Sequence, residues 1–275
     1  MKMRIGSGDS PLAVIQGKLV LERVQELAPQ AELELVPIAE GGEQPLEAAL
    51  LDGRVDIAVH PLKEMALEQD PRLPLAAFLK RRDPRDSLVL RKGLERFPLQ
   101  GGVIGTDSQR RMLQLEAFYP TAQIKPVRGE LTKLMEQLDA GEYDALVLSA
   151  AEVKWQGLEH RISRYFNTDQ LIPAVGQGIL AIQCRMDADL PFLPQLGDVE
   201  TTSCAIAERA FVRTLQRDRQ DPSTAYAEIH NGVLKMVGFC LDGKGAQKRG
   251  AVAGRPVRAA EMGIRLAKQL GGEQR

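Results

Sequence analysis

Short apolar runs alternate with amphipathic helical patterns through the first half of the chain, and this alternation restricts the fold more than any other feature of the sequence. The runs 3–7 and 55–59 are typical of buried strands, and Leu12–Leu27 between them has the period of an amphipathic helix. A second series of the same units begins near Gly101. Such repetition predicts an α/β fold of two lobes with mainly parallel sheets.

The last third of the chain has a different pattern. Thr201–Leu215 is typical of one long helix, and Asn231-Gly232 between two strand patterns indicates a hairpin turn. A third strand and a closing helix follow, so we predict a small α+β domain with three antiparallel strands. We expect its boundary within 190–199, where two prolines and a glycine occur.

Composition excludes several classes of function. Lys and Arg number 36 against 37 Asp and Glu, and this near balance predicts no nucleic-acid partner. The three cysteines and three histidines are widely spaced, which predicts neither a disulfide framework nor a metal site. No apolar run reaches the roughly 18 residues of a membrane helix and no secretory signal is present, so we expect a cytoplasmic protein without membrane contact.

Polar residues follow two predicted strands of the first lobe, at the strand ends where ligands of open α/β sheets bind. Ser10 either caps the first helix or helps to hold an anion there. Lys63 and Glu64 follow the strand 55–59 and could manage a proton, although alone they are typical of a surface ion pair. The charge run Lys80–Asp86, by contrast, is interpreted as a crossover between the lobes held by salt links.

A third polar stretch opens the first helix of the second lobe. Thr106 and Ser108 supply hydroxyl groups, and Arg110 and Arg111 supply guanidinium groups, a combination that suits carboxylates or phosphates. Arg128 follows the next strand and could add a third cation. Convergence of the three arginines would form an anion pocket, and a solvated helix start is the alternative.

Five segments stand out by their order along the chain: Asp56–His60, Arg82–Asp86, Gly105-Thr106 with Ser108 and Arg110-Arg111, Gly141–Ala145, and Leu171–Gly178 with the letters LIPAVGQG. This order of motifs resembles the porphobilinogen deaminase (hydroxymethylbilane synthase) family. The resemblance implies two lobes similar to periplasmic binding proteins, with a cleft between them, and a small third domain. It places lobe 1 at 1–82 with 173–195, lobe 2 at 83–172 and the α+β domain at 196–275.

The resemblance also implies an enzyme of tetrapyrrole biosynthesis that condenses four porphobilinogen units into hydroxymethylbilane with loss of ammonia. In this family a cleft aspartate assists the loss of ammonia, and that position is Glu64 here, next to Lys63. We expect a monomer whose partners are a small carboxylated pyrrole and, as a candidate, another enzyme of the pathway. The residues that would bind substrate or cofactor carboxylates are Ser10, Thr106, Ser108, Arg110, Arg111, Arg128 and Gln177.

Three departures from the family pattern bear on the mechanism. Glu64 moves the catalytic carboxylate by one methylene group. The segment 39–47 is shorter than the family's lid, and Arg219 stands where the family has the cysteine that carries its dipyrromethane cofactor. A guanidinium cannot act as the thiolate nucleophile, so we expect no covalently attached cofactor and a non-covalent pyrrole primer instead. Arg219 could pair with a carboxylate of the bound pyrrole.

Three functions therefore remain open. The chain is a hydroxymethylbilane synthase with an altered mechanism, or a non-catalytic paralogue that binds porphobilinogen or a linear tetrapyrrole, or a relative that handles another small carboxylate. Turnover of porphobilinogen by the purified protein would separate the first function from the other two.

Overall fold

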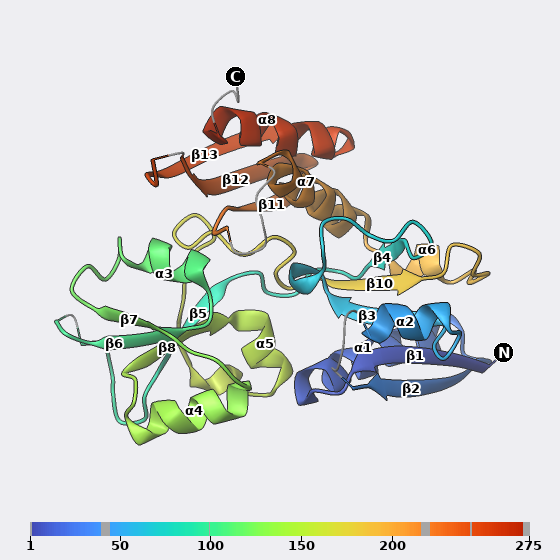
Figure 1. The fold of residues 1–275 in the computed structure, drawn as a ribbon, viewed down its shortest axis with the longest axis horizontal. Coiled ribbons are helices and arrows are strands. Elements are labelled where there is room, and N and C mark those ends of the chain that lie inside the picture. The colour runs from blue at the N-terminus through green and yellow to red at the C-terminus, as the bar shows by residue number, and fades with distance from the viewer. Residues whose placement is uncertain (1, 40–44, 99, 216–220, 243, 272–275) are drawn as a thin grey trace. The chain divides into compact units, whose positions relative to one another are not determined.

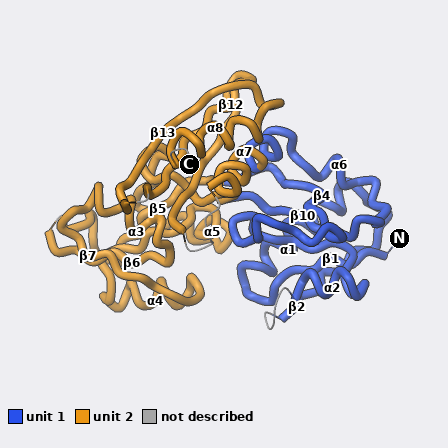
Figure 2. Tube along the Cα trace, turned by 45° about the horizontal axis from the view of Figure 1, so that its top comes forward, with its two compact units in different colours: residues 1–82, 178–205 blue, residues 83–177, 206–275 orange. Residues whose placement is uncertain are grey.

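The computed structural model describes residues 2–39, 45–98, 100–215, 221–242 and 244–271 and confirms the predicted α/β fold (Figure 1). The chain forms two compact units, Met1–Arg82 with Gly178–Ala205 and Asp83–Gln177 with Ile206–Arg275 (Figure 2). Each unit contains a five-stranded mixed sheet, and unit 2 also contains a three-stranded sheet. The division into three domains with the boundaries given above stays a prediction.

Unit 1 is built on a sheet with the strand order β2-β1-β3-β10-β4. Strands β1, β2 and β3 pair in parallel, whereas β10 pairs antiparallel with β3 and β4. The elements are β1 (Lys2–Gly8), α1 (Pro11–Leu27), β2 (Glu32–Ile38), α2 (Pro45–Leu51), β3 (Ile57–Pro61), η1 (Leu62–Glu64), β4 (Leu75–Phe78), β10 (Leu180–Cys184) and α6 (Leu193–Leu196).

Helix α1 packs closely against the sheet of unit 1 because of a glycine on its buried face. A Cβ atom at Gly17 would lie 2.6 Å from Leu35 Cδ1 and 3.0 Å from Ser7 Cβ. Val20 and Val24 extend the same buried face toward the helix end. The amphipathic period of this segment therefore gives the packing that the sequence predicts.

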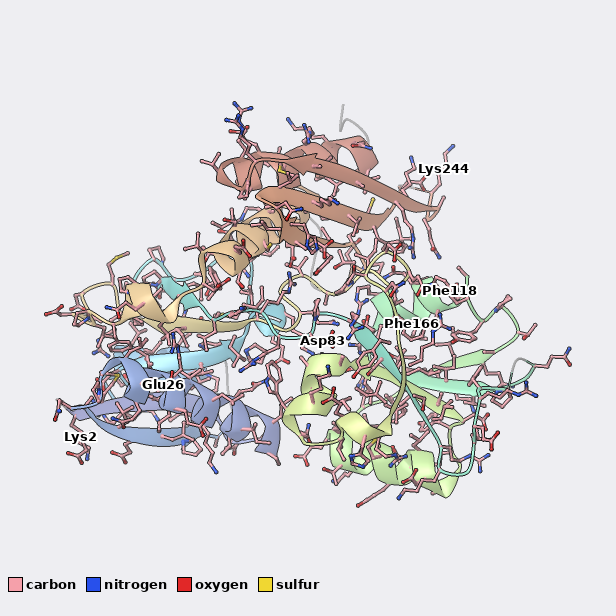
Figure 3. All side chains as sticks on the ribbon, turned by 180° about the vertical axis from the view of Figure 1, so that it is seen from behind. Lys2, Glu26, Asp83, Phe118, Phe166 and Lys244 are labelled. Carbon is pink, nitrogen blue, oxygen red and sulfur yellow. The ribbon has the colours of Figure 1, made fainter. Side chains whose placement is uncertain are left out.

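Unit 2 contains a sheet with the order β7-β6-β8-β5-β9, in which β7, β6 and β8 are parallel and β5 is antiparallel to both its neighbours. Its core includes Ile104, Leu115 and Phe166, all fully buried (Figure 3 labels Phe166). The elements are β5 (Asp86–Leu90), β6 (Val103–Thr106), α3 (Gln109–Leu115), β7 (Gln123–Pro126), α4 (Leu131–Ala140), β8 (Ala145–Ser149), α5 (Ala150–Trp155), η2 (Glu159–Arg161) and β9 (Ile162–Tyr165).

The C-terminal part of unit 2 is an antiparallel sheet in the order β11-β12-β13, as predicted. The hairpin turn between β11 and β12 has positive φ angles at Asn231 (51°) and Gly232 (74°), which suit a tight two-residue turn. Gly263 allows α8 to approach α7, because a Cβ there would collide with the Ala207 carbonyl oxygen. The elements are α7 (Val199–Leu215), which contains the boundary between the units, β11 (Thr224–His230), β12 (Val233–Leu241), β13 (Gln247–Gly254), η3 (Pro256–Arg258) and α8 (Ala259–Gly271).

Candidate functional site

Asp86, the first residue of β5, is the centre of a buried polar cluster in unit 2. Its side chain is fully buried, and its Oδ1 accepts hydrogen bonds from Arg111 Nε and Gln177 Nε2, each over 2.9 Å. Arg110 Nη2 lies 2.8 Å from the other carboxylate oxygen. Burial alone would raise the pKa of Asp86, but attraction by the two arginines lowers it below its ordinary value. One buried carboxylate therefore stabilises two buried cations.

The residues before the arginines use their hydroxyl groups within unit 2. Ser108 is the N-cap of α3, and its hydroxyl accepts the backbone N–H of Arg111 over 3.5 Å. Thr106 ends β6, and its hydroxyl donates to the carbonyl of Val147 over 2.9 Å. These bonds fix the start of α3 and place Arg110 and Arg111 on its first turn, beside Asp86.

Arg110 binds the segment 172–177, which precedes the chain's return to unit 1. Its guanidinium donates to the Ile172 carbonyl (2.5 Å) and to Gln177 Oε1 (3.5 Å). Gln177 in turn donates to the Pro84 carbonyl over 2.7 Å. Burial lowers the pKa of Arg110 below its ordinary value, although Asp86 opposes the shift. Arg110 is only 5% exposed and is committed to internal contacts.

Arg111 connects the buried cluster to the surface. It is 3% exposed, and its Nη1 donates to Asp107 Oδ1 over 2.6 Å. Burial opposes its charge, but Asp86 and Asp107 outweigh burial and raise the pKa of Arg111 above its ordinary value. The Asp107 side chain is 49% exposed, so the cluster meets solvent at this carboxylate.

The third predicted cation of unit 2 lies apart from the other two. Arg128 is exposed after the end of β7. Among the described residues, no hydrogen bond or ion pair joins it to Arg110, Arg111 or Asp86. The structure therefore brings together Arg110, Arg111 and Gln177, with Arg128 outside the cluster.

The predicted residues of unit 1 lie at two places. Ser10 caps α1, accepting the backbone N–H of Ala13 over 3.3 Å, which confirms the capping alternative. Lys63 and Glu64 lie in η1 with Nζ and Oε1 3.8 Å apart, and their side chains are 20% and 62% exposed. Two other predictions fall outside the described residues: Arg219 does so entirely, and the shortened segment 39–47 does so at residues 40–44.

A polar cluster around Gln183 of β10 was not predicted. Gln183 is fully buried and donates to the Leu73 carbonyl (2.9 Å) and to Glu47 Oε1 (3.3 Å). Burial lowers the pKa of nearby His60 from 6.5 to about 4, although a hydrogen bond with Gln183 opposes the shift. The signal that could have revealed this cluster is a glutamine within an otherwise apolar strand, Leu180–Cys184.

A second buried carboxylate that sequence reasoning missed is Glu208 of α7. Its two carboxylate oxygens accept backbone N–H groups of Gly176 and Ala227, each over 2.8 Å. The Thr224 hydroxyl donates to the Pro173 carbonyl over 2.5 Å. Glu208 and β11 therefore hold the same segment, 172–177, that Arg110 and Asp86 hold through Gln177.

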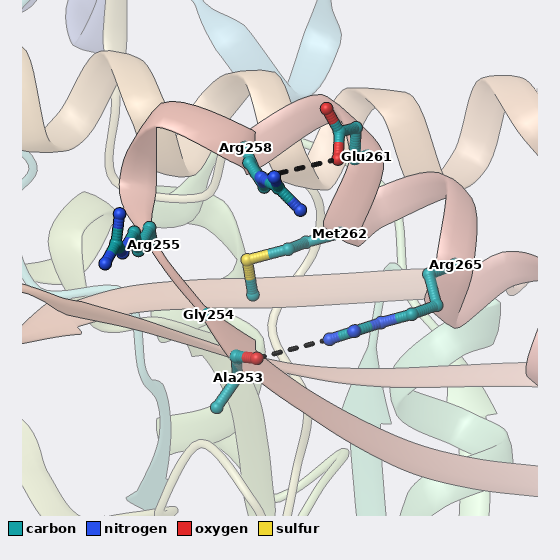
Figure 4. A pocket seen from close by; sticks show the side chains of 7 residues that line it. All are labelled: Ala253, Gly254, Arg255, Arg258, Glu261, Met262 and Arg265. Atoms are coloured by element: carbon teal, nitrogen blue, oxygen red, sulfur yellow. Dashed lines mark hydrogen bonds and ion pairs between the residues drawn. The ribbon is translucent and has the colours of Figure 1, made fainter.

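A separate hollow of about 460 Å³ lies between the end of β13 and the start of α8 (Figure 4). Arg255, Arg258, Arg265 and Met262 line it, and Arg258 pairs with Glu261 at 3.9 Å. None of the predicted site residues contributes to this hollow. Within the described ranges, no group of His, Cys, Asp or Glu side chains could hold a metal ion. The same part of the chain has no helix long and apolar enough to cross a membrane.

The sequence matches two family descriptions. Residues 3–190 match "Porphobilinogen deaminase, dipyromethane cofactor binding domain", and residues 202–272 match "Porphobilinogen deaminase, C-terminal domain". Proteins named porphobilinogen deaminase from Acetivibrio thermocellus and Alkaliphilus oremlandii are each 38% identical to this chain. They align over 98% and 99% of this chain, and over 98% of each relative. Among solved structures, the periplasmic aliphatic sulphonate binding protein SsuA from Escherichia coli is 13% identical, with a TM-score of 0.43 over 78% of this chain and 70% of that one.

The first of these matches corrects one prediction. We expected no covalent cofactor because Arg219 replaces the family cysteine, yet the matched domain is described as one that binds the dipyromethane cofactor. The prediction was wrong because it relied on a single aligned position. The matched cofactor-binding domain spans residues 3–190, and position 219 lies outside it.

The two matched regions follow each other in family order and together include most of the chain. The relatives named above agree with them over nearly the full length of both partners. This chain belongs to the porphobilinogen deaminase family.

Proposed function

We propose that this protein binds porphobilinogen and condenses it into a linear tetrapyrrole with loss of ammonia, by a mechanism altered at Glu64. The observation that carries the proposal is the match to both family domains, together with relatives named porphobilinogen deaminase at 38% identity. Acetate and propionate groups make such a ligand an anion, and guanidinium groups recognise carboxylates through charge-assisted hydrogen bonds. Unit 2 supplies such groups.

Arg111 and Arg128 are the cations that fit this ligand best. Arg111 already binds one half-exposed carboxylate, that of Asp107, at the surface of the cluster. Arg128 is exposed on the same unit. Arg110 and Asp86 are positioning residues, since their mutual contact is buried and fixes the first turn of α3. A bound dipyrromethane, which carries the same kinds of carboxylate, would supply the pyrrole to which porphobilinogen is added.

We propose that Glu64 carries out the proton transfer that accompanies the loss of ammonia. Its carboxylate lies 3.8 Å from Lys63 Nζ. Glutamate carries its carboxylate one methylene farther from the backbone than the aspartate of the family pattern. Since a misplacement of about 1 Å can reduce a rate about a hundredfold, we expect turnover slower than that of the Acetivibrio thermocellus relative.

Binding without turnover is the second candidate function. The observation in its favour is the exposure of the Glu64 side chain, 62%, since a catalytic carboxylate works best where water is excluded. A protein of this kind would hold porphobilinogen or a linear tetrapyrrole without releasing ammonia.

The test is to incubate the purified protein with porphobilinogen and to measure released ammonia and, after oxidation, uroporphyrin absorbance. The Acetivibrio thermocellus relative is the positive control, and the Glu64→Gln variant is the matched negative control. Ammonia release by the wild-type chain that is lost in Glu64→Gln supports the enzyme. Binding measured by calorimetry without ammonia release supports the second function. Absence of both contradicts the proposal. Intact mass of the same sample reports attached pyrroles directly.

A further inference from the structure

Arg111 has two carboxylate partners that differ sharply in exposure. Asp86 is fully buried and accepts Arg111 Nε, whereas the Asp107 side chain is 49% exposed and accepts Nη1 over 2.6 Å. The first contact is part of the folded core of unit 2. The second lies at its surface, where water and solutes can replace one partner by another.

The charges around Arg111 show what Asp107 does there. Arg110 and Arg111 carry two positive charges, and Asp86 supplies one negative charge within the buried part of the cluster. Asp107 supplies a negative charge from the surface, and Glu152 also acts on Arg111 electrostatically. Of these two carboxylates, Asp107 is the one that accepts Arg111 Nη1, so its removal would leave that N–H group open to another anion.

We propose that Asp107 is a built-in competitor for the carboxylate of the ligand and thereby sets the affinity of the site in unit 2. The ligand carboxylate takes the place of the Asp107 carboxylate on Arg111 Nη1, so one anion exchanges for another on the same cation. Asp86 retains its contact with Arg111 Nε throughout. This inference rests on the proposed function for the identity of the ligand, a carboxylated pyrrole, but not for the exchange itself.

The proposal makes Asp107 a residue that sets the affinity for the ligand. When the ligand replaces Asp107 on Arg111, one ion pair is lost and another is formed. The binding free energy of the ligand is therefore the difference between these two ion pairs. An ion pair that solvent reaches at one partner, as here at Asp107, is worth a factor of about two to five in an equilibrium constant. Removal of the Asp107 charge is therefore expected to tighten binding by about two- to fivefold.

The experiment compares porphobilinogen binding by calorimetry in the wild-type protein, Asp107→Asn and Asp139→Asn. Asp139 is the matched control, since it lies in unit 2 and accepts hydrogen bonds from Arg161 Nη1 and Nη2 over 3.1 and 2.8 Å. Both substitutions remove one negative charge and one arginine partner. Tighter binding in Asp107→Asn alone is expected. Equal or weaker binding in Asp107→Asn, or the same gain in Asp139→Asn, would overturn the proposal.

A second measurement separates this inference from the proposed function. Succinate, a plain dicarboxylate, is titrated while the Arg111 side-chain Nε–H signal is followed by nuclear magnetic resonance. Half-maximal change at an about two- to fivefold lower succinate concentration in Asp107→Asn than in wild type supports the exchange. An unchanged succinate concentration refutes it. If no variant binds porphobilinogen, the proposed function fails, and the succinate titration still decides the role of Asp107.

Discussion

Asp86→Asn would leave Arg110 and Arg111 buried without the carboxylate that both contact. Asn keeps the shape of the side chain but removes the charge that compensates two guanidinium groups, which are 5% and 3% exposed. Removal of one partner from a buried ion pair costs about 3–5 kcal/mol. Since the whole free energy of unfolding of a domain is about 5–15 kcal/mol, the variant should be severely destabilised at neutral pH.

The assay is urea unfolding of the whole protein at pH 7, followed by circular dichroism, with Asp83→Asn as the matched control. Asp83, labelled in Figure 3, accepts hydrogen bonds from Arg85 (2.8 Å) and Lys154 (2.8 Å). Those cations have side chains that are 38% and 29% exposed, so water can replace Asp83 and the loss should be about 1–2 kcal/mol. A loss in Asp86→Asn no greater than that in Asp83→Asn would refute the buried-charge argument.

The pH dependence gives the same reasoning a second test. The pKa of Asp86 is lowered in the folded protein, so its stabilising effect is present above the pKa of the unfolded carboxyl, about 4, and is lost as the pH falls through the folded value. Wild-type stability should therefore fall in acid by more than that of Asp86→Asn. If the unfolding free energy fell with pH equally steeply in both proteins below about pH 4, Asp86 would have the same pKa in the folded and the unfolded state, which would refute the reasoning.

Three further predictions concern other parts of the molecule. Glu64→Asp should raise the rate of ammonia release by up to about a hundredfold, because it restores the shorter carboxylate; an unchanged or lower rate would refute the idea that the longer side chain limits turnover. Between pH 6.5 and the lowered His60 pKa of about 4, His60 is protonated in the unfolded chain but neutral in the folded protein. Unfolding free energy should then fall by up to about 3 kcal/mol in wild type but not in His60→Gln, as urea titrations at several pH values would show. Gly263→Ala should lower the unfolding free energy by about 3 kcal/mol, because its Cβ would collide with Ala207, whereas Gly197→Ala, with its nearest neighbour at 3.7 Å, should change it little in thermal unfolding.

The pattern of strands and helices was predictable where periodicity and turn chemistry agree. The hairpin at Asn231-Gly232 and helix α8 were both predicted, because a two-residue turn and a helical period are local properties. Strands β9 and β10 were not predicted. Each has only four or five residues, and Leu180–Cys184 is buried on both faces, so it lacks the alternation that identifies a strand.

The candidate site was predictable in its residue types but not in its pairing. The sequence analysis singled out Arg110 and Arg111, but the sequence does not show that Asp86 lies against both of them. Asp86 belongs to the charge run Lys80–Asp86, which was expected to form salt links, and the structure confirms such links at Asp83 and Asp86. Which member of a charge run is buried depends on the sheet, since Asp86 is the first residue of β5 and its pairing with β8 buries it.

Two buried carboxylates on different elements hold the segment 172–177, to which the arginine pair is joined through Arg110. Asp86 of β5 holds Gln177 by its side chain, and Glu208 of α7 holds Gly176 by its backbone N–H. Neither carboxylate could be replaced by an apolar residue without leaving a buried donor unpaired. Arg110 binds the same segment at the Ile172 carbonyl, so any movement of the segment must also move the first turn of α3. The position of Arg111, on that same turn, is thus coupled to a segment with which it makes no contact of its own among the described hydrogen bonds.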